Sequence, residues 1–248
     1  MTPLIELENI VAGYDDQTVL NRVNLSIRSE DFIGIIGPNG GGKTTLLKVI
    51  LGLLKPFSGE VRYLVPKQNL FGYLPQNSRI DQRFPINVTE VVLSGLMSKK
   101  GLYKSYTKSD KQFAHSLLDK YGLTTYKENA ISELSGGQMQ RVFLCRAIIS
   151  NPRILILDEP MTYVDSSFEQ EFYSILKELN KQLSIIMVSH DLGTICSHVK
   201  TIACVNREVH YHHSNLITDE QLQAYNCPIE LLSHGQIPHR VLKKHEHL

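Results

Sequence analysis

Residues 37–44 of the chain read Gly37-Pro38-Asn39-Gly40-Gly41-Gly42-Lys43-Thr44, which fits the pattern G-x-x-x-x-G-K-[ST]. An apolar strand pattern precedes this stretch and a helical pattern follows it, and in that context the pattern predicts a phosphate-binding loop. Glycines let backbone N–H groups turn towards phosphate oxygens, and the N-terminus of the next helix adds about half a positive charge. We expect Lys43 to reach the β- and γ-phosphates, the Thr44 hydroxyl to bind Mg²⁺, and Thr45 to complete the binding segment.

Strand patterns dominate the sequence around this loop. Segments rich in strand-forming residues, separated by polar or glycine breaks, are predicted at 4–11, 18–27 and 31–36, with a short strand at 60–64. Residues 46–51 instead follow a helical spacing and fit a short buried helix that ends at Gly52. The first part of the chain is therefore predicted to be mostly β-structure with one helix after the loop.

A mostly helical block then interrupts the strands. Thr89 is a candidate N-cap for a helix through Leu93, and residues 109–121 read as a further helix. We predict a single α/β domain with a core at 1–76 and 150–205, an inserted helical subdomain at 77–149, and a histidine-rich segment at 206–248.

Two apolar runs, 154–157 and 185–188, flank a helical pattern in the second half of the chain. A strand–helix–strand unit of this kind predicts two parallel strands whose carboxyl ends share one edge of the sheet. Asp158-Glu159 follows the first run and Ser189-His190 follows the second. Because ligands of open parallel sheets bind at that edge, we expect the chemistry of the protein there.

These polar side chains suggest distinct roles. Asp158 stands where an aspartate holds Mg²⁺ through water in phosphate-loop enzymes, and Glu159 could act as general base on the attacking water. Paired acids can also simply cap the following helix. His190 is placed to lie near the γ-phosphate, although a lone histidine can equally be a satisfied core residue.

A second glycine-containing helix start lies at Leu134-Ser135-Gly136-Gly137-Gln138. Ser135 and Gln138 form an acceptable capping box, so an ordinary helix start is one interpretation. Glycine, however, costs roughly 1 kcal/mol relative to alanine inside a helix, and two in a first turn favour close approach of an anion. Since one phosphate site already lies at 37–44, this second anion site is predicted to serve a nucleotide held by another copy of the chain.

With these residues in view, the chain resembles the nucleotide-binding subunits of ABC transporters over nearly its whole length. Residues 134–138 match the family signature and residues 154–159 match its second nucleotide motif. The remaining motifs are matched by single residues: the glutamine loop by Gln76, the switch histidine by His190, the interface loop by Asp165, and the adenine-stacking aromatic by Tyr14. Tyr14 could alternatively be a half-buried strand tyrosine.

The resemblance implies a phosphate-loop NTPase core (RecA-like) with an N-terminal antiparallel β subdomain and an inserted α-helical subdomain. It implies that two copies face head to tail around two ATP molecules, with Ser135, Gly137 and Gln138 of one copy at the γ-phosphate held by the other. Gln76 would sense the nucleotide, assist catalysis and join Thr44 and Asp158 around Mg²⁺. Met161 and Val164 depart from the family pattern near the interface loop, where Thr and Leu are common.

The cargo is indicated by two features. Residues 84–96 look like the corresponding stretch of zinc- and manganese-type importers and are also similar to iron-chelate importers. Seven of the ten histidines follow residue 206, and on a strand His210 and His212 would share a face suited to a divalent ion, although solvated surface histidines are the simpler interpretation. Transition-metal import is the hypothesis; an ATPase of an iron-chelate importer, or a soluble ABC ATPase of iron–sulfur cluster assembly, is the alternative.

The composition and charge of the chain limit the classes of partner that it is expected to bind. The 26 basic and 25 acidic residues give a net charge of +1, which provides no global basic field for nucleic acid. No run reaches the roughly 18 apolar residues of a membrane span, and the first ten residues do not resemble a signal peptide. We therefore expect a peripheral protein at the cytoplasmic face of the cell membrane. Its expected partners are integral-membrane permease subunits and, indirectly, an extracytoplasmic solute-binding protein.

Overall fold

The computed structural model describes residues 2–76, 86–97, 105–161, 166–189, 192–212, 214–215, 231–232 and 239–240. The chain forms two compact units, one comprising Met1–Leu64 with Ile186–Leu248 and the other Val65–Ile185. The predicted subdomain boundaries at 77–149 and 206–248 stay a prediction.

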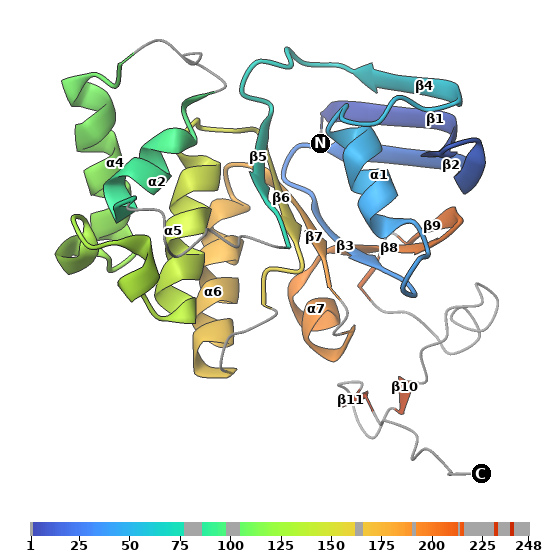
Figure 1. Cartoon of the computed structure of the whole chain (residues 1–248). Coiled ribbons are helices and arrows are strands. Elements are labelled where there is room, and N and C mark those ends of the chain that lie inside the picture. The colour runs from blue at the N-terminus through green and yellow to red at the C-terminus, as the bar shows by residue number, and fades with distance from the viewer. Residues whose placement is uncertain are drawn as a thin grey trace. The chain divides into compact units, whose positions relative to one another are not determined.

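An antiparallel sheet begins the first unit. It consists of β1 (Pro3–Tyr14), β2 (Gln17–Arg28) and β4 (Ser58–Tyr63), hydrogen-bonded in the order β2-β1-β4 (Figure 1). Ile5 and Leu7 of β1 are buried on one face, as the alternation of a strand places them, and Ile10 is buried beyond a register shift that separates it from Leu7. The predicted N-terminal antiparallel β subdomain is thereby confirmed.

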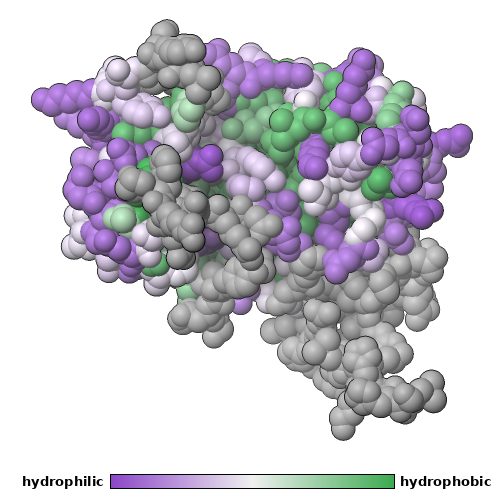
Figure 2. Space-filling view, in the orientation of Figure 1, coloured by the Kyte–Doolittle hydropathy of each residue, from purple (hydrophilic) through white to green (hydrophobic). Residues whose placement is uncertain are grey.

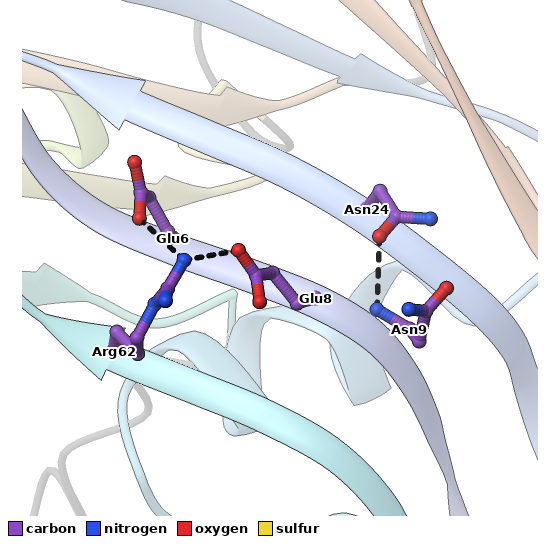
Figure 3. A network of polar contacts seen from close by, with 5 residues as sticks. All are labelled: Glu6, Glu8, Asn9, Asn24 and Arg62. Atoms are coloured by element: carbon purple, nitrogen blue, oxygen red, sulfur yellow. Dashed lines mark hydrogen bonds and ion pairs between the residues drawn. The ribbon is translucent and has the colours of Figure 1, made fainter.

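Ion pairs between side chains link two strands of this sheet. Arg62 of β4 forms ion pairs with Glu6, at 2.9 Å, and with Glu8, both on β1 (Figure 3). Nearby, the Asn9 backbone N–H donates to the Asn24 side-chain oxygen at 2.9 Å, which links β1 to β2. Exposed ion pairs contribute only about 0–1 kcal/mol each, so these contacts favour the register of the strands more than their stability.

The phosphate-loop part of the first unit follows. β3 (Phe32–Ile36) is buried along its length and pairs in parallel with β8 (Thr201–Asn206), which pairs antiparallel with β9 (Glu208–His212). α1 (Lys43–Ile50) starts after the loop and contacts β1 and β2. α7 (Leu192–His198) lies against β3, where a Cβ at Gly34 would come within 3.0 Å of Ile195. Two short strands, β10 (Leu231–Leu232) and β11 (His239–Arg240), pair with each other.

The second unit combines parallel strands with helices. β5 (Phe71–Leu74) pairs in parallel with the fully buried β6 (Ile154–Asp158). The helices are α2 (Val88–Ser94), α4 (Lys108–Lys120), α5 (Gly136–Ile148) and α6 (Ser166–Leu179), with 3-10 turns η1 (Thr124–Tyr126) and η2 (Ile131–Glu133). α2, α4 and α5 contact one another (Figure 1), as expected for the predicted helical subdomain. β7 (Ser184–Val188) is a further strand that is buried along its whole length.

One local prediction is wrong, and one strand was missed. Thr89 is not the cap of α2: Asn87 is, because its side chain accepts from the Glu90 N–H while the Glu90 carboxylate accepts from the Asn87 N–H. The strand β5 was not predicted, since its four residues offer too short a pattern to separate it from the glutamine loop that follows.

The visible described surface is mainly hydrophilic, and three of the cysteines are buried. Hydrophilic residues cover most of the visible described surface in Figure 2, with apolar patches between them. In the described ranges no helix combines the length and apolarity that crossing a bilayer requires. Cys145, Cys196 and Cys204 are buried, and burial raises the pKa of the Cys145 thiol to about 12, so this thiol stays protonated and unreactive.

Candidate nucleotide site

The phosphate loop has the backbone shape that its glycines allow. Gly40 has φ +75° and no atom lies within 4 Å of the position that a Cβ would take, so the tip of the loop is open. Gly42 caps α1 in a left-handed conformation at φ +103°, and a Cβ there would lie 2.7 Å from Leu20. A side chain at Gly42 would therefore both strain the backbone and clash at the point where the helix begins.

Lys43 lies inside this loop. Its side chain is buried, 7% exposed, and the ammonium donates to the carbonyl oxygens of Gly37 at 2.9 Å and Pro38 at 3.0 Å. Thr44 is exposed and Thr45 is buried at 5% exposure. The first unit therefore brings together the predicted lysine, an exposed hydroxyl and the glycine backbone, a combination suited to binding phosphate oxygens.

Tyr14, the predicted adenine platform, ends β1 and is 41% exposed. A residue of this exposure is compatible both with the stacking role and with the alternative of a half-buried strand tyrosine. Lys48 of α1 donates to the Tyr14 hydroxyl at 3.1 Å, a contact that sequence reasoning missed. The sequence signals this contact only through the position of Lys48, which lies four residues after Thr44 and on the same face of the helix.

Asp158 closes β6 in the second unit and is 4% exposed. The Tyr73 hydroxyl of β5 donates to Asp158 Oδ2 at 3.4 Å. Burial, and then the charge of Asp158, raise the pKa of Tyr73 to about 12, so the phenol keeps its proton and stays a donor to the carboxylate. Tyr73 was not predicted as a site residue; it precedes the glutamine loop directly.

Glu159 and Gln76 meet in the same unit. Glu159 has a left-handed backbone, φ +50°, which turns the chain sharply after β6. The exposed Gln76 side-chain amide donates to Glu159 Oε2. The structure therefore brings together the two residues predicted as nucleotide sensor and general base.

The signature turn starts α5 at the surface. Ser135 caps the helix and forms the capping box: its N–H donates to Gln138 Oε1 at 2.9 Å, and the Gln138 N–H donates to Ser135 Oγ at 3.4 Å. A Cβ on Gly137 would lie 2.8 Å from the Phe168 ring, so packing requires this glycine. The helix-start interpretation is thus confirmed, and it leaves the exposed Ser135 and Gly136 accessible to a further ligand.

One residue after the signature was also missed. The Gln140 side-chain amide donates to the Pro160 carbonyl at 2.6 Å, which ties α5 to the segment that follows Glu159. Arg141 forms an ion pair with Glu171 at 2.7 Å and places its guanidinium 5.2 Å from the centre of the Phe168 ring. These contacts fix the signature helix within its unit.

Several predicted residues are not tested by this geometry. His190, Asp165 and Val164 lie outside the described residues. His210 and His212 are on β9, and burial together with the charge of His210 lowers the pKa of His212. Across the described parts of the chain, no three His, Cys, Asp or Glu side chains are grouped to hold a metal ion.

Each unit offers oxygen groups of the kind that Mg²⁺ prefers, which are carboxylate, hydroxyl and water oxygens. Asp158 offers a carboxylate at a strand end, Thr44 an exposed hydroxyl and Gln76 an exposed amide oxygen. Their donor chemistry matches the predicted magnesium ligands.

The chain matches the model of a protein family described as ABC transporter, over residues 20–162. It is 37% identical over 237 residues to a zinc uptake system ATP-binding protein of Listeria innocua, covering 90% of this chain and 92% of that protein. It is 42% identical over 212 residues to a "Probable metal transport system ATP-binding protein" of Chlamydia muridarum, with coverage of 84% and 87%. Among solved structures, the dimeric bacterial ABC transporter cassette MJ0796 is similar with a TM-score of 0.70, 26% identity, and coverage of 87% of this chain and 100% of that one.

Proposed function

The chain belongs to the ABC transporter family, and from that premise we propose that it is the ATP-binding, ATP-hydrolysing subunit of an importer for a transition-metal ion, zinc or manganese. Its ATPase domain is of the kind that hydrolyses ATP in transporter subunits. The observation that carries the metal is the 37% identity, over 90% of this chain, to a zinc uptake ATP-binding protein.

The relatives favour this cargo over the alternatives. The Chlamydia muridarum relative is named for metal transport, and a Pasteurella multocida relative, 38% identical over 209 residues, is named for zinc import. An iron-chelate importer or an iron–sulfur assembly ATPase would not by itself account for these names.

In the proposed mechanism, the glycine backbone and Lys43 hold the β- and γ-phosphates of ATP. Mg²⁺, held by Thr44, Asp158 and Gln76, would neutralise phosphate charge. Glu159 orients the attacking water and takes its proton, and the Gln76 amide at Glu159 Oε2 keeps that carboxylate in place until water and nucleotide bind. His190 contacts the γ-phosphate, and Tyr14 stacks on adenine.

The second half of each site comes from a second copy of the chain. Ser135, Gly137 and Gln138 would contact the γ-phosphate held by the other copy, and Asp165 would lie at the interface between them. The exposure of the signature turn and the similarity to a dimeric cassette support this arrangement. Closure around ATP would drive permease subunits in the membrane, which receive the ion from an extracytoplasmic solute-binding protein and hold this chain at the cytoplasmic face.

Metal accumulation tests the proposal. Cells lacking this chain are expected to lose most of their high-affinity uptake of zinc or manganese, measured as cell-associated metal after growth at limiting concentrations. Re-expression of the parent chain should restore uptake and the Glu159→Gln variant should not, since transport requires hydrolysis. Unchanged zinc, manganese and iron together with altered uptake of another solute would contradict the metal assignment.

A further inference from the structure

The Lys48 side chain contacts Tyr14, the proposed adenine platform, in two ways. Its ammonium lies 3.1 Å from the Tyr14 hydroxyl and 5.1 Å from the centre of the Tyr14 ring. The shorter distance places the charge at the hydroxyl end of the ring and not above its middle. The contact therefore restrains the ring without placing the ammonium over its centre.

Backbone hydrogen bonds fix the position of Lys48 at the end of α1. Lys48 lies in the last turn of α1, and its carbonyl accepts from the N–H groups of Leu53 at 2.8 Å and Leu54 at 3.1 Å. The helix starts at the phosphate loop, and Lys48 shares a face with Thr44 one turn earlier. One short helix therefore links the phosphate-binding residues to the aromatic residue at the end of β1.

Tyr14 needs such a restraint because it is exposed. At 41% exposure, much of its surface faces solvent, and stacking on a base orders a side chain that would otherwise sample several rotamers. An aromatic ring already held in one orientation binds a ligand at a lower entropic cost.

We propose that Lys48 is a positioning residue for the adenine base, which holds Tyr14 in the orientation that stacks on the nucleotide. The inference rests on the proposed function and extends it, because it assigns to α1 a role in recognising the base as well as the phosphates. Lys48 acts through Tyr14 and needs no contact with the nucleotide.

Calorimetric titration of the full chain with Mg²⁺-ADP and with inorganic triphosphate tests this. Lys48→Met is expected to raise the dissociation constant of ADP about fivefold and to leave that of triphosphate unchanged. Tyr14→Phe, which keeps the ring but removes the hydroxyl acceptor, should have the same effect on ADP. The double variant should be no worse than either single variant, since both remove one contact.

Three further measurements separate positioning from other roles. Lys48→Arg, which keeps a cation able to reach the ring, should bind ADP within about twofold of the parent. Lys55→Met removes a charge from the exposed turn after α1 and should change neither ligand. In ATP hydrolysis, Lys48→Met should raise KM while kcat stays near that of the parent.

Equal weakening of ADP and triphosphate would show that Lys48 acts through its charge on the phosphates and would overturn the inference. Unchanged ADP affinity in Lys48→Met, or additive effects in the double variant, would overturn it as well. In each case, binding by the parent chain leaves the proposed function intact. A parent chain that binds neither ligand would overturn the proposed function and this inference together.

Discussion

Glu159→Gln is expected to lower the ATP turnover number by about 10²- to 10⁴-fold, the usual contribution of a general base. The substitution is nearly isosteric, and its amide oxygen can still accept from the Gln76 amide that contacts Glu159 Oε2. The local structure is therefore retained while the basic group is lost. ATP binding should persist, so the variant should accumulate an ATP-bound dimer, which size-exclusion chromatography with and without Mg²⁺-ATP detects.

Glu128→Gln is the matched control, because Glu128 is an exposed acid in the same unit. It should hydrolyse ATP at the parent rate and form no stable dimer. Unimpaired turnover in Glu159→Gln would remove Glu159 from the role of base.

Lys43→Met is expected to weaken ATP binding by about tenfold to a hundredfold or more, since a hydrogen bond to a charged group contributes about 1.5–3 kcal/mol. Lys43 is buried in the loop and its ammonium is held by two carbonyl oxygens, so its charge lies within the phosphate-binding backbone. Methionine has a similar length without the charge. Equilibrium titration with ATP measures the loss.

The two carbonyls lose their donor in this variant, so its folding is checked by thermal unfolding alongside Lys55→Met, the control for loss of a nearby positive charge. A Lys43→Met chain that melts like the parent but binds ATP as tightly would remove Lys43 from the phosphate site. If the Lys43→Met chain unfolds, Lys43→Gln replaces it, because the amide can still donate to a carbonyl oxygen but carries no charge.

The sequence predicts the elements that carry long or repeated patterns. The strands near 4–11 and 18–27, the helix near 109–121 and the buried run at 154–157 all occur, with ends that differ by a few residues. The α2 cap was mistaken because Asn87 and Thr89 both have side chains that accept from a helix N-terminus, and only the fold selects Asn87. The four-residue strand β5 has too few residues for a periodic signal.

For the site, residue types and spacing are sufficient where a motif is contiguous, as at Lys43 and Ser135. Contacts between distant segments could not be predicted. Tyr73 at Asp158, Gln140 at the Pro160 carbonyl and Lys48 at Tyr14 each depend on the packing of separate elements. Gly137 illustrates the limit, because the sequence suggested approach of an anion whereas the structure shows in addition a ring, Phe168, that excludes a side chain.

The central claim is that one nucleotide site is shared by two copies of the chain, and sedimentation velocity of mixed variants tests it most directly. All chains carry Glu159→Gln to prevent hydrolysis; one also carries Lys43→Met and the other Ser135→Asp, which keeps a good helix cap but adds a negative charge. We predict that with Mg²⁺-ATP each variant alone stays monomeric, while their mixture forms dimers, because one site then has an intact Lys43 from one copy and an intact Ser135 from the other. A mixture that stays monomeric while Glu159→Gln alone dimerises, or a Ser135→Asp chain that dimerises by itself, would contradict the account.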